Sequence, residues 1–96
     1  MVAVAREERR NQRKPRVEVL FPPGDVSAAL DLFELAELAW HDCYGEITPP
    51  EQVIADILVV SEGDLAKLVA AARLAVRDWR DLRVAADSMR SRGDSI

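Results

Sequence analysis

The sequence predicts an all-α protein with one small three-helix domain over residues 25–90. Three stretches carry apolar residues at helical spacing, each begins at a capping signal, and glycine or proline separates them. An extended segment (17–24) and a disordered basic arm (1–16) precede the domain, and a flexible tail (91–96) follows it. The 96 residues are enough for a single domain.

The N-terminal arm, residues 1–16, is polar and has no sustained apolar period. It carries two acids and six bases, namely Arg6, Arg9, Arg10, Arg13, Lys14 and Arg16. Such a segment buries too little apolar surface to offset its ordering entropy, so we expect it to be disordered in isolation. A helix between Ala5 and Lys14 would require a surface supplied by a partner.

The segment after the arm suits an extended conformation. Val17, Val19 and Phe21 alternate to one side, and the two prolines that follow stop any helix. A single strand cannot form a sheet alone, so it would pack across the helices or pair with another chain.

The first predicted helix begins near Asp25 or Ser27 and ends before Gly45. One side is apolar and holds Val26, Ala29, Phe33, Ala36, Trp40 and Cys43, widened by Ala28, Leu32, Leu35 and Ala39. The other side holds Asp31, Glu34, Glu37 and His41. So wide an apolar face indicates a helix that touches two neighbours.

Two further helices follow. The first has Thr48 as its cap, Pro49 at its first position and Glu51 completing a capping box, and it ends near Val60. The second opens at the 61–64 stretch, Ser-Glu-Gly-Asp, and runs from residue 65 to about residue 90. Its apolar stripe comprises Leu65, Leu68, Val69, Ala72, Ala75, Val76, Trp79, Leu82 and Ala86.

Residue types suited to catalysis are scarce, because the chain has one cysteine and one histidine. Glu37 and His41 lie one helical turn apart, but two ligands do not make a metal site, so we expect an exposed helical pair. Cys43 lies on the apolar side, which predicts a buried, inert thiol. We therefore predict no catalytic, cofactor-binding or metal-ligating residues and no enzymatic activity.

Charge is unevenly distributed, since residues 17–72 carry eleven acids against Lys67 alone. The last helix presents Arg73, Arg77 and Arg80 on one side. This side is either a solvated face or a site for an anion or an acidic partner. Two pairs at helical spacing are also expected there, Arg77 with Asp81 and Arg83 with Asp87. The basic arm could follow a nucleic-acid backbone, although no aromatic residue is interleaved for base stacking.

Four apolar residues fall outside the helical stripes and indicate additional covered surface, namely Leu30, Leu38, Leu74 and Val84. We therefore predict a non-enzymatic protein–protein interaction module, regulatory or accessory, that forms a homodimer through helices 25–44 and 65–90 or binds another protein. One alternative is a nucleic-acid accessory protein that uses the arm. The other is an acidic, immunity-like inhibitor of a basic toxin.

The setting predicted from composition is a bacterial cytoplasm. Eleven arginines against two lysines indicate a genome rich in G and C. The apolar run at residues 1–5 is too short for the core of a signal peptide, and no stretch is long enough to cross a membrane.

Overall fold

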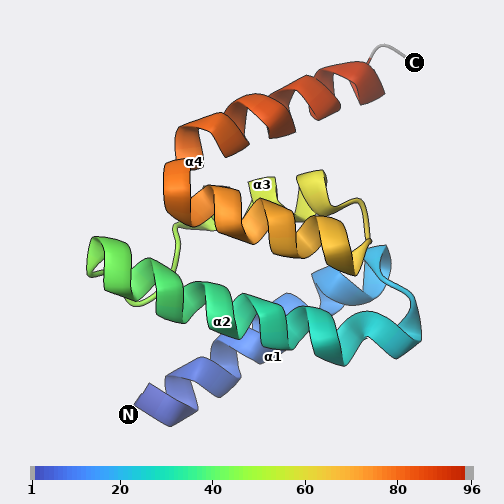
Figure 1. Cartoon of the computed structure of the whole chain (residues 1–96). Coiled ribbons are helices and arrows are strands. Elements are labelled where there is room, and N and C mark those ends of the chain that lie inside the picture. The colour runs from blue at the N-terminus through green and yellow to red at the C-terminus, as the bar shows by residue number, and fades with distance from the viewer. Residues whose placement is uncertain (1, 95–96) are drawn as a thin grey trace.

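A computed structural model describes the backbone of residues 2–94 and the side chains of residues 6–92 (Figure 1). Over the described residues the fold is all-α, as predicted, and contains no strand. The helices are α1 (Val2–Leu20), α2 (Val26–Tyr44), α3 (Glu51–Ser61) and α4 (Leu65–Asp94), with a short 3-10 turn at Pro23–Asp25. The domain therefore has one more helix than the sequence predicted.

The extra helix replaces both the disordered arm and the extended segment. Val17 is fully buried and Phe21, one helical turn later, is 3% exposed, whereas Val19 between them is 84% exposed. The predicted strand is wrong, because a strand would place Val19 on the same face as Val17 and Phe21, whereas in a helix residues four apart share a face and the residue between them points away. The predicted stop is confirmed, since α1 ends at Leu20 and Pro22 and Pro23 follow. Met1 lies outside the described residues.

The second helix agrees with the prediction at both ends. Gly45 adopts a left-handed conformation (φ 73°) and its N–H donates to the carbonyl of His41 at 2.8 Å. Ala29, Phe33 and Trp40 are buried as expected. The prediction for Cys43 is wrong, because its thiol is exposed. Cys43 lies in the last turn of α2, directly before the helix ends at Tyr44.

The start of α3 differs from the predicted capping box. Pro50 is extended (φ −55°, ψ 151°), no side chain caps the helix, and α3 begins at Glu51. Thr48 and Pro49 each precede a proline, and a residue before proline is disfavoured in the helical conformation. The hydroxyl of Thr48 instead accepts a hydrogen bond from Arg13 at 2.8 Å.

The last helix bends at Asp78, which has extended backbone angles (φ −159°, ψ 92°). The Asp78 carboxylate accepts a hydrogen bond from the backbone N–H of Arg80 at 3.1 Å, as an N-cap does, so Asp78 starts a second helical stretch. The bend separates Arg77 from Asp81, and their predicted pair is absent among the described side chains. The helix reaches Asp94, so the predicted tail is helical up to that residue, and residues 95–96 lie outside the described part.

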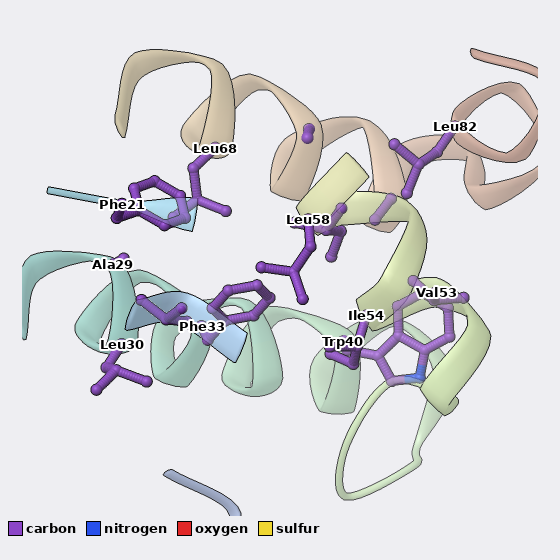
Figure 2. Packing of buried hydrophobic residues seen from close by; sticks show 14 residues of the cluster. Phe21, Ala29, Leu30, Phe33, Trp40, Val53, Ile54, Leu58, Leu68 and Leu82 are labelled. Atoms are coloured by element: carbon purple, nitrogen blue, oxygen red, sulfur yellow. The ribbon is translucent and has the colours of Figure 1, made fainter. Parts of the chain in front are cut away.

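The hydrophobic core receives side chains from all four helices (Figure 2). Its largest fully buried members include Phe33 on α2, Ile54 and Ile57 on α3, and Leu68 and Leu82 on the two stretches of α4. Helix α3 packs chiefly against α4, and α2 packs against both α1 and α4.

Candidate functional site

An apolar groove lies between α2 and the first stretch of α4. The two helices run side by side in the same direction (Figure 1), and the Tyr44 hydroxyl donates to the carbonyl of Val76 at 2.8 Å near their ends. The groove has a volume of about 460 Å³. Its lining comprises Leu32, Leu35, Ala36 and Ala39 from α2 and Val69, Ala72, Arg73, Val76 and Arg77 from α4.

The groove exposes large apolar side chains to water. Leu35 is 60% exposed and Val69 is 40% exposed, and the half-exposed Leu38 lies next to Leu35 on the side of α2 away from α4. Small alanines at 36, 39 and 72 leave space between the leucine and valine ridges. A contiguous apolar hollow of this kind is typical of a surface that another helix covers.

Two ridges of opposite charge border the groove. On α4, Val69, Arg73 and Arg77 follow one another at four-residue spacing along the outer edge. On α2, Leu35, Leu38 and Asp42 form the corresponding ridge. None of the three charged residues has an ion pair within residues 6–92. The α4 wall of the groove therefore carries uncompensated positive charge, and Asp42 lies about one helical turn beyond Ala39, where the α2 lining ends.

The bases of the N-terminal arm differ from Arg73 and Arg77 in that most of them are ion-paired. Four of the six are paired with carboxylates of this chain. Arg10 lies 2.8 Å from Asp31 and 3.0 Å from Glu34 on α2. Arg16 pairs with Glu51 at the start of α3. Arg9 and Arg13 both pair with Glu37 on α2. These contacts between α1 and the rest of the domain explain why a polar segment forms a helix.

Glu37 is buried rather than exposed, so the predicted pair with His41 is wrong. The carboxylate lies 3.2 Å from Arg13, whereas His41 is exposed. Burial alone would raise the pKa of Glu37, but hydrogen bonds from Arg9 and Thr48 and the two arginine charges outweigh it and lower the pKa. The carboxylate therefore stays charged and joins α1 to α2.

A second buried carboxylate, Asp56 on α3, was not singled out from the sequence. Arg83 donates to it at 2.6 Å and Arg90 lies 2.9 Å away, both from the second stretch of α4. Burial would raise the pKa of Asp56, but hydrogen bonds from Arg83, Gln52 and Arg90 lower it overall. The predicted pair of Arg83 with Asp87 is wrong, since Asp87 pairs with Arg90 instead.

The four residues predicted as an interface lie in different places. Leu30 is buried on the side of α2 that faces α1, and Leu74 is partly buried against the core. Leu38 lies next to Leu35 in the neighbouring hollow that Arg6 lines, and Val84 is 69% exposed beyond the bend of α4. The sequence predicted Leu35 and Val69 to face the core, because both lie on apolar stripes. Helical spacing alone does not show how far along a stripe the neighbouring helices cover it.

The other predicted basic contacts also separate. Arg73 and Arg77 line the groove, whereas the Arg80 guanidinium lies 5.5 Å from the centroid of the Trp79 ring. Arg6 lies beside Leu35 and Leu38 in a shallow hollow, and Lys14 is exposed on α1. The predicted site residues are therefore divided among several places: Arg73 and Arg77 meet at the α2–α4 groove, whereas the bases of the arm gather in hollows beside α1.

Within the described residues, no cluster of His, Cys, Asp and Glu is suited to hold a metal ion. None of the helices described is long and apolar enough to cross a bilayer. Comparisons with protein-family models, with curated proteins and with solved structures find no match to this chain.

Proposed function

We propose that this chain is a non-enzymatic protein–protein interaction module, regulatory or accessory in kind, that binds an α-helical surface in the groove between α2 and α4. The exposure of Leu35 and Val69 in an apolar hollow of about 460 Å³, with the half-exposed Leu38 next to Leu35, carries this proposal. Covering such side chains is favourable by about 25 cal/mol for each Å² of apolar surface removed from water.

The buried charges support a structural rather than a catalytic role for the ionisable groups. Glu37 and Asp56 each contact two arginines, and the pKa of each is lowered, which keeps the carboxylate charged. A general acid at neutral pH needs the opposite shift. Both carboxylates instead join helices of the domain.

The nucleic-acid alternative is weaker, because phosphates would have to compete with carboxylates for four of the six bases of the arm. Arg6 and Lys14 remain, which would give only a small counterion-release effect. The interaction module is therefore our first choice.

The test is affinity purification of the full chain from its own cells, with quantitative mass spectrometry. Leu35→Asp places a charge on the groove, whereas Val84→Asp makes the same kind of change on an exposed residue beyond the bend. We expect proteins that the Val84→Asp control recovers to be lost with Leu35→Asp. Equal recovery by both variants would refute the proposal, and recovery of a basic toxin would identify an immunity-like inhibitor.

A further inference from the structure

The geometry points to a second copy of this chain as the occupant of the α2–α4 groove, with α2 of each copy lying against α4 of the other. This inference rests on the proposed function and names the partner. Its basis is the placement of charge beside the groove: Arg73 and Arg77 line it on α4, and Asp42, two helical turns after Leu35, continues the α2 ridge just past the lining.

Asp42 and Arg77 lie at one end of the groove, and Arg73 lies about one helical turn closer to its middle. The hydrogen bond from Tyr44 to Val76 fixes the level at which α2 and α4 are aligned. Asp42 is two residues before Tyr44, and Arg77 directly follows Val76. Because both helices run in the same direction (Figure 1), Asp42 and the two arginines lie within about one and a half helical turns of a common level.

A two-fold axis parallel to the helices makes use of this arrangement. It places α2 of one copy opposite α4 of the other and keeps each residue at its level along the groove. Asp42 of each copy then meets Arg73 and Arg77 of the other, so the contact forms twice. Leu35 and Leu38 of each copy then lie within about one helical turn of the level of Val69 on the opposite α4.

The other face-to-face arrangement brings like charges together. With the axis across the helices, α2 would pack antiparallel on α2 and α4 on α4, so Arg73, at the middle of the α4 ridge, would lie opposite Arg73 of the other copy, and Asp42 would meet no arginine. Like charges placed opposite one another in an interface are strongly unfavourable. The charge pattern therefore selects the arrangement in which α2 packs on α4.

The experiment measures the mass of the full chain by sedimentation equilibrium and light scattering over a wide range of concentration. We expect wild type to reach twice the 10.7 kDa of one chain. Asp42→Lys alone, and Arg73→Glu combined with Arg77→Glu, should each weaken self-association at least about tenfold. Glu18→Lys changes the same charge at an exposed site on α1 and should leave self-association unchanged, and circular dichroism should show equal helicity in all of these proteins.

Mixing the two groove variants distinguishes this arrangement from any other dimer. A heterodimer of Asp42→Lys with the double arginine variant has Lys opposite Glu in one contact and Asp opposite Arg in the other. We therefore expect mixing to restore the dimer. A monomeric wild type, dimers that persist in both variants, or a mixture that stays monomeric would each overturn the inference. Loss of a different protein with Leu35→Asp would still support the proposed function in those cases.

Discussion

Asp56 on α3 accepts a hydrogen bond of 2.6 Å from Arg83, which lies beyond the bend of α4. The carboxylate is fully buried, whereas the arginine side chain is 35% exposed. Arg90, two turns further along, lies 2.9 Å from the other oxygen. The bend at Asp78 redirects α4 so that both arginines reach the same carboxylate, which anchors the second stretch of α4 on α3.

We predict that Asp56→Asn destabilises the protein. The amide keeps the shape but loses the charge that holds two arginines, and the free energy of unfolding should fall by about 1–3 kcal/mol. Chemical unfolding followed by the fluorescence of Trp40 and Trp79 measures this. Asp87→Asn removes only an exposed contact of Arg90 and should change stability by less than about 0.5 kcal/mol. Equal losses in the two variants would contradict the anchoring role.

Stability should decrease in acid because of the two buried carboxylates. The pKa values of Glu37 and Asp56 are lowered by folding, from ordinary values of 4.5 and 3.8. A group with a lowered pKa contributes its stabilisation above its ordinary pKa and loses it as pH falls through the folded value. The free energy of unfolding should therefore be level from pH 7 to about 5 and decrease below about 4.

The variant Glu37→Gln isolates one of these groups. It should be less stable than wild type at neutral pH, and its stability should fall less steeply in acid because one titrating carboxylate is missing. Glu7→Gln, at an exposed position on α1, should keep the wild-type slope. Unfolding curves from pH 7 to 3 give both slopes, and an unchanged slope in Glu37→Gln would count against this assignment.

The register of α1 is tested by two valines that lie two residues apart. Val17→Ala removes methyl groups from a fully buried site and should cost about 1–3 kcal/mol, whereas Val19→Ala, at a residue that is 84% exposed, should be nearly neutral. A strand that used both valines on one face would make the two costs similar. Chemical unfolding of the two variants therefore distinguishes helix from strand at this segment.

The three helices after residue 25 could be predicted because their signals are local. The apolar period, Gly45 and the capping aspartate of α4 each act within one or two turns. The Asp64 carboxylate, for instance, accepts from the N–H of Lys67 at 3.0 Å. The bend at Asp78 also had a local signal, since Asp78 and Asp81 have the spacing of a second capping pattern.

Helix α1 could not be predicted in the same way. Its stability depends on Arg10 meeting Asp31 and Glu34, and on Arg9 and Arg13 meeting Glu37, which are contacts over more than twenty residues of sequence. The groove was missed for a related reason. Leu35 and Val69 lie on apolar stripes, and only the packing of whole helices shows that nothing in the described chain covers them.

The turn between α3 and α4 accommodates the end of α1 only because residue 63 is glycine. Gly63 has φ 75°, and a Cβ placed there would lie 2.2 Å from the carbonyl oxygen of Leu20. We predict that Gly63→Ala costs more than the roughly 1–2 kcal/mol expected for a left-handed alanine, because the end of α1 must also move away.

Two other glycines separate these contributions. Gly45→Ala has the same backbone strain (φ 73°) with nothing within 4 Å of the new Cβ, so it should show the conformational cost alone. Gly24→Ala has neither feature and should be nearly neutral. In thermal and chemical unfolding, Gly24→Ala should be the most stable of the three variants, Gly45→Ala less stable, and Gly63→Ala the least stable. If Gly63→Ala were no less stable than Gly45→Ala, the close approach of α1 to this turn would be wrong.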